Sequence, residues 1–244
     1  MAKVVVLDNL TETFSGHIVR SGLQKSSKLD ARAFAKLGHD VTYIYCGSLE
    51  DDYPYTKLPI NDIGAKEHLM RDGKNPRATG VYLKKYLQDQ RVANVLNSAD
   101  YIIAHCHSVG MITSINSIAN EKKILFVIHD VIDMTWAVGF SQVLIKAREK
   151  TNNKIFIATN SRYSIDKLNY IHERCAGKEY LEGKNLLSGD EVFDGFIEHF
   201  VWTDVEPTEE QILSVEPKSA IIGRYEPNKY HHKVYGYNNP NNVI

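Results

Sequence analysis

Two polar residues that could take part in catalysis directly follow an apolar run in the middle of the chain. The run KILFVI, residues 123–128, is typical of a buried parallel strand, and His129 and Asp130 come immediately after it. At the carboxyl end of such a strand, these side chains could accept a proton or orient a hydroxyl group. An ordinary polar strand end is the alternative, because so short a motif is not specific.

Two more histidines, His105 and His107 in AHCHS, end a second apolar run in the same way. Together with His129 they could in principle ligate a metal ion. No carboxylate at a suitable spacing supports that interpretation, so we expect no metal site.

A second group of candidate residues lies in IIGRYEPNK, residues 221–229. Arg224 and Lys229 leave a predicted strand through Gly223. Arginine offers a planar fork of donors and lysine a mobile point charge, so the two could bridge a diphosphate. Two cations placed there would stabilise a departing nucleoside diphosphate without a metal.

Two further features could bind phosphate groups. Gly22 lies at the first predicted strand-to-helix turn, where it would let backbone amides approach an anion, although a plain turn glycine explains it equally well. Residues 64–91 contain seven basic and three acidic residues. The basic side chains that could contact nucleic-acid phosphates are Lys74, Arg77, Lys84 and Lys85. A solvated lysine-rich surface is the alternative.

Alternating strands and helices must position these residues. The predicted strands are 3–8, 39–47, 99–106, 123–130, 154–161 and 196–203. The predicted helices are 23–38, 81–96, 110–123, 140–150 and 162–174, and residues 47–63 are predicted to be a loop. This alternation predicts an α/β, Rossmann-like, doubly wound domain with a mostly parallel sheet, which binds ligands beyond the carboxyl ends of its strands.

The domain organisation follows from a change in composition. We predict an acceptor-side domain over 1–205, an acidic, proline-punctuated linker over 206–218, and the first strand and tail of an incomplete second domain over 219–244. No apolar run approaches the ~20 residues of a membrane span. Three widely spaced cysteines indicate free thiols in a reducing cytoplasm.

Taken in order, these motifs resemble the GT-B glycosyltransferases. The shared marks are the glycine turn at Gly22, GHDVTYIY at 38–45, and Arg224 with Lys229. More narrowly, the chain is similar to the N-terminal part of the DNA α-glucosyltransferases of T-even bacteriophages. That similarity runs along nearly all 244 residues through SGLQKSSKLDARAFAKLGHDVTYIY, VIHDVID, IFIATNSRYSIDKL, VFDGFIEHFVWTDVEP and IIGRYEPNK.

The resemblance implies two Rossmann-like domains that face each other across a cleft, with the acceptor on the first and the sugar donor on the second. Enzymes of this kind transfer a sugar from a UDP-sugar, here with UDP-glucose as the favoured donor, to 5-hydroxymethylcytosine in double-stranded phage DNA, with retention of configuration. It assigns His129 and Asp130 to the catalytic loop and Arg224 and Lys229 to the donor diphosphate. It further implies no cofactor, base flipping of the target and action in the cytoplasm of an infected bacterium.

Two departures from the family pattern matter. Tyr230 replaces the glycine that usually follows the lysine, and the E-x7-E motif that holds the donor cannot be placed after Lys229. We therefore expect a second polypeptide to supply the donor domain, or a truncated product, and an isolated chain without activity. The alternatives are a non-catalytic DNA-binding protein and a GT-B enzyme with a non-DNA acceptor.

Overall fold

The computed structural model describes residues 1–8, 22–45, 53–60, 89–106, 109–129, 131, 133–178, 182–197, 219–220 and 242–243. The chain divides into two compact units, Met1–Phe200 and Val201–Ile244. The predicted linker, 206–218, lies outside the described residues.

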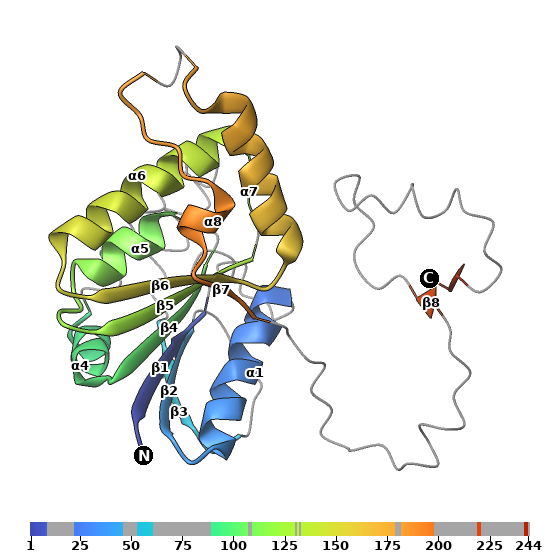
Figure 1. The fold of residues 1–244 in the computed structure, drawn as a ribbon. Helices are drawn as coiled ribbons and strands as arrows, with labels where there is room; N and C mark the ends of the chain where they lie inside the picture. The colour runs from blue at the N-terminus through green and yellow to red at the C-terminus, as the bar shows by residue number, and fades with distance from the viewer. Residues whose placement is uncertain are drawn as a thin grey trace. The chain divides into compact units, whose positions relative to one another are not determined.

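In its described part, the first unit is an α/β domain built on one seven-stranded sheet (Figure 1). The strands are β1 (Lys3–Leu7), β2 (Asp40–Tyr45), β3 (Thr56–Pro59), β4 (Tyr101–Cys106), β5 (Lys123–Ile128), β6 (Lys154–Thr159) and β7 (Gly195–Phe196). Their order in space is β3-β2-β1-β4-β5-β6-β7, and every neighbouring pair is parallel. The predicted doubly wound, Rossmann-like fold is thereby confirmed.

The strand order reverses between β1 and β4. From β1 the sheet grows outward through β2 and β3, and the chain then returns to place β4 on the other side of β1. In open parallel sheets, ligands bind beyond the carboxyl ends of the strands at such a reversal. We therefore expect a ligand site among the residues that follow β1, β4 and the strands beside them.

Helices cover the two faces of this sheet. They are α1 (Gly22–Lys36), α4 (Gln90–Ser98), α5 (Val109–Asn116), α6 (Met134–Lys150), α7 (Arg162–Cys175) and α8 (Gly189–Val192). Figure 1 shows α1 on the opposite face of the sheet from α5 and α6. Because strand side chains alternate between faces, each face has its own core. One contains Phe126, Phe140 and Leu144, and the other contains Val6, Ala31 and Val127.

Several element boundaries differ from the prediction, among them those of one strand and two helices. The stretch 47–63 is not a loop throughout, because Thr56–Pro59 forms β3, an edge strand that pairs with β2. Helix α6 begins six residues before Phe140, since the Asp133 side chain accepts a hydrogen bond from the Trp136 N–H at 2.8 Å and caps it. Helix α5 ends at Asn116 rather than 123, where β5 already begins.

Two short elements complete the description. Helix α8 was not predicted, although Ser188 and Glu191 form a capping box at its start. In the second unit, β8 (Ser219–Ala220) pairs in parallel with β9 (Asn242–Val243) in a separate two-stranded sheet. Ser219 and Ala220, in the segment where the first strand of the second domain was predicted, therefore lie in a strand, and residues 221–223 lie outside the described residues.

Candidate functional site

Five polar residues lie on the α1 face of the sheet, at or just beyond the carboxyl ends of its central strands. They are Asp8 after β1, Asp30 on α1, His105 on β4, His129 after β5 and Asn160 after β6. The alternation of side chains explains their common face. Side chains two positions apart on a strand point to the same face of the sheet. Asp8 therefore shares its face with Val6, and His129 shares its face with Val127.

His105 is the centre of the cluster. Its side chain is fully buried, although it is a polar residue within β4. Its Nε2 lies 3.0 Å from Asp30 Oδ2, and its Nδ1 lies 2.9 Å from His129 Nε2. Buried polar atoms cost free energy unless they are hydrogen-bonded, and both nitrogens of this ring have a partner.

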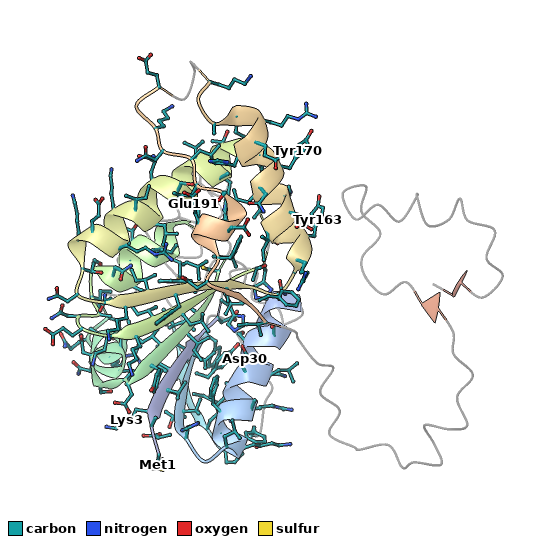
Figure 2. All side chains as sticks on the ribbon, viewed as in Figure 1. Met1, Lys3, Asp30, Tyr163, Tyr170 and Glu191 are labelled. Atoms are coloured by element: carbon teal, nitrogen blue, oxygen red, sulfur yellow. The ribbon has the colours of Figure 1, made fainter. Side chains whose placement is uncertain are left out.

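Helix α1 brings Asp30 to this position because its inner face packs on the sheet. Ser27 and Ala31 are fully buried one turn apart, and the Ser27 hydroxyl lies 3.0 Å from the Tyr43 hydroxyl. Asp30 is three residues after Ser27 and therefore on a neighbouring line of the same helix surface. Figure 2 labels Asp30 on α1, and its side chain is 25% exposed.

His129 connects the buried histidine to the next strand. Strand pairing sets His105 opposite Val127, so His129 extends one side-chain step beyond the buried ring. The two imidazole centroids are 5.2 Å apart. The second nitrogen of His129, Nδ1, lies 3.1 Å from Asn160 Nδ2. Both ring nitrogens of the predicted catalytic histidine are thus held by protein side chains.

The structure describes only part of the predicted site. Gly22 is the first residue of α1, as the predicted strand-to-helix turn required. Residues that lie outside the described part of the chain are His107, Asp130, Arg224, Lys229, Lys74, Arg77, Lys84 and Lys85. Asp8, Asp30 and Asn160 were not predicted as site residues. For Asp8 and Asn160 a signal was present, since both directly follow an apolar strand run.

Metal sites, membrane-spanning helices and cavities can likewise be assessed only among the described residues. There, no group of three or more histidine, cysteine or acidic side chains is placed to hold a metal ion. No helix in the described ranges is long and apolar enough to cross a membrane. A cavity of about 180 Å³ lies beside the start of β2 and β3, where His39, Tyr53 and Tyr55 are among its lining residues and neither His105 nor His129 is.

The chemistry that the cluster offers is acid–base and hydrogen-bonding chemistry. Two imidazoles, a carboxylate and an amide come from four separate elements at the edge where doubly wound sheets bind ligands. The chain matches no family model, and no curated protein sequence is similar enough to it to count as a relative. What the protein does must therefore be argued from this site.

Proposed function

We propose that the chain is the acceptor-side part of a GT-B glycosyltransferase that transfers a sugar from a UDP-sugar to 5-hydroxymethylcytosine in DNA, with retention of configuration. One observation carries the proposal. His129, in the loop that the family resemblance assigns to catalysis, belongs to a polar cluster at the carboxyl edge of the sheet, near the reversal of strand order. An acceptor hydroxyl bound at that edge would meet the loop that starts at His129.

The reaction consists of three changes in the substrates. The bond from the anomeric carbon to the UDP oxygen breaks, a bond from that carbon to the hydroxymethyl oxygen forms, and the hydroxyl proton passes to the departing UDP. We assign the orientation of the hydroxyl to Asp130 rather than to His129, because both ring nitrogens of His129 are already engaged. Arg224 and Lys229 would stabilise the negative charge of the departing UDP, with no metal or further cofactor required.

The DNA partner follows from the same reaction. A base inside a duplex must leave the stack before an enzyme can reach it, and this costs a few kcal/mol. Lys74, Arg77, Lys84 and Lys85 are the proposed phosphate contacts that hold the duplex during that step. We further propose that a separate polypeptide supplies the donor-side domain and that the reaction takes place in the cytoplasm of an infected bacterium.

The test uses two DNA duplexes of one sequence, with 5-hydroxymethylcytosine or cytosine at a single position. We expect the chain to bind the modified duplex more tightly and, once a GT-B donor-side domain is added, to transfer label from UDP-[14C]glucose to that duplex alone. Replacing His129 by alanine should abolish labelling. His39→Ala should leave labelling unchanged, because His39 lies at the far, amino end of β2.

Two outcomes would contradict the proposal. Equal binding of both duplexes, with no label under any complementation, would identify a non-catalytic DNA-binding protein. Labelling of a glycan without binding of DNA would identify a glycosyltransferase with another acceptor.

A further inference from the structure

The four side chains Asp30, His105, His129 and Asn160 form one unbroken hydrogen-bonded chain. The contacts run from Asn160 Nδ2 to His129 Nδ1 at 3.1 Å, from His129 Nε2 to His105 Nδ1 at 2.9 Å, and from His105 Nε2 to Asp30 Oδ2 at 3.0 Å. Asp30 comes from α1, His105 from β4, and the other two from the loops after β5 and β6. No two of these side chains belong to the same element, so the hydrogen-bonded series forms only when the sheet is folded.

The donors and acceptors of this chain can be assigned from its ends. A carboxylate only accepts, so Nε2 of His105 must carry the hydrogen that points to Asp30. In a neutral ring the other nitrogen then accepts, and His129 must donate from Nε2 to His105 Nδ1. The remaining nitrogen of His129, Nδ1, accepts from the amide NH₂ of Asn160. Every hydrogen therefore points in one direction, toward Asp30.

The opposite placement of the hydrogens is worse at the Asn160 end. If His129 carried its hydrogen on Nδ1, that N–H would face the amide NH₂, and two donors cannot share a hydrogen bond. Turning the amide would present Oδ1 instead. It would also move the NH₂ to the position of Oδ1, which is buried and has no hydrogen-bond partner among the described residues. The arrangement in the structure leaves only the lone pairs of Oδ1 unused at that position, whereas the turned amide would leave N–H donors unbonded there, so the amide favours one form of the ring.

From this geometry we infer that Asp30, His105 and Asn160 are positioning residues, which hold His129 as its Nε2–H tautomer with the ring in one orientation. The side chain that precedes Asp130 is then fixed at both nitrogens. His129, the first residue of the loop that the resemblance assigns to catalysis, is consequently held in one orientation at the sheet edge. The tautomer follows from the contacts alone, whereas its importance for sugar transfer rests on the proposed function.

Nuclear magnetic resonance of the full chain with ¹⁵N-labelled histidine tests the inference. In the unsubstituted protein, both rings should show a protonated Nε2 and an unprotonated Nδ1. Asn160→Asp presents only acceptors to Nδ1, so His129 should change to a ring that carries a hydrogen on Nδ1. The matched control Asn97→Asp adds the same charge on exposed α4 and should leave the His129 spectrum unchanged.

A second variant keeps the test decisive if Asn160→Asp does not fold. Asp30→Ala removes the terminal acceptor, and the ring N–H hydrogens of His105 and His129 should then exchange with water about tenfold faster or more. An Nδ1 that stays unprotonated in folded Asn160→Asp would overturn the inference. So would ring hydrogens that exchange equally fast with and without Asp30.

A labelling assay with the donor-side domain present separates this inference from the proposed function. If sugar is transferred, Asp30→Ala should lower kcat about tenfold or more while KM for the modified duplex stays within about twofold, because Asp30 acts through His105 rather than on the DNA. An unchanged kcat would reject the positioning role. If no sugar is transferred at all, the proposed function fails, and the spectra still decide the tautomer.

Discussion

The amide of Asn153 joins two connections at the amino edge of the sheet, and its removal should destabilise the whole domain. Asn153 lies between α6 and β6 and is 8% exposed. Its Oδ1 accepts from the Lys122 N–H at 2.8 Å, and its Nδ2 donates to the Ala119 carbonyl oxygen at 2.8 Å and to Asn116 Oδ1 at 2.9 Å. One side chain therefore ties the α5–β5 turn to the start of β6.

The magnitude follows from those three bonds. A hydrogen bond contributes a net ~0.5–1.5 kcal/mol, and more is lost when a buried partner stays unsatisfied. Asn153→Ala should therefore lower the free energy of unfolding by about 2–4 kcal/mol. In a domain of this size that corresponds to a fall in Tm of about 5–15 °C. Urea denaturation followed by far-ultraviolet circular dichroism measures the change, and the m-value should stay constant.

Two further variants make this test specific. Asn97→Ala removes an exposed amide in α4 that donates one bond to the Ala93 carbonyl oxygen, and it should change stability by no more than about 0.5 kcal/mol. Asn153→Asp keeps the acceptor for Lys122 but turns a carboxylate toward two oxygen acceptors. At neutral pH it should destabilise more than Asn153→Ala. If Asn153→Ala were as stable as Asn97→Ala, the amide would not hold these turns together.

Three other predictions concern backbone space, thiol reactivity and pH. Gly189→Ala should destabilise, because a Cβ there would lie 2.5 Å from a backbone oxygen of α7. Gly139→Ala in α6 meets no atom within 4 Å and should stabilise by about 0.5–1 kcal/mol, and urea midpoints compare the two. Burial raises the pKa of Cys106 to about 12, so a thiol reagent should label half-exposed Cys175 before Cys106 in peptide mass spectra. Equal labelling of these two cysteines in the native protein would contradict this. The hydrogen bond from the Ser188 backbone N–H lowers the pKa of Glu191, so its ionised form stabilises the fold above the unfolded pKa of about 4.3. This stabilisation is lost as the pH falls through the lower folded pKa. In Glu191→Gln the urea midpoint should therefore depend less on pH between about pH 5 and 3.

Much of the sheet could be predicted from apolar runs, whereas its edges and one helix start could not. Buried parallel strands such as KVVVL and KILFVI are continuous β-branched or aliphatic runs, and this pattern is readable without the fold. The edge strand TKLP has four residues and no such run, because pairing with β2 rather than burial maintains it. The helix predicted over 140–150 starts six residues later than α6, in which the packing of Ala137 and Phe140 against the core outweighs the low helix propensity of Gly139.

The candidate site shows which step from sequence to structure is hardest. Both histidines of the cluster could be placed at strand ends from the sequence, but their contact depends on the register that sets His105 opposite Val127. A shift of one residue would turn His129 to the other face of the sheet. Asp30 is 75 residues from its partner His105 and lies in an amphipathic helix, where a single acidic residue is indistinguishable from a solvated charge. Only the packing of α1 over β1 and β4 turns that charge into the end of a hydrogen-bonded chain. Site residues carried by a strand end are therefore readable from sequence, whereas those carried by a covering helix become readable only once the strand order is known.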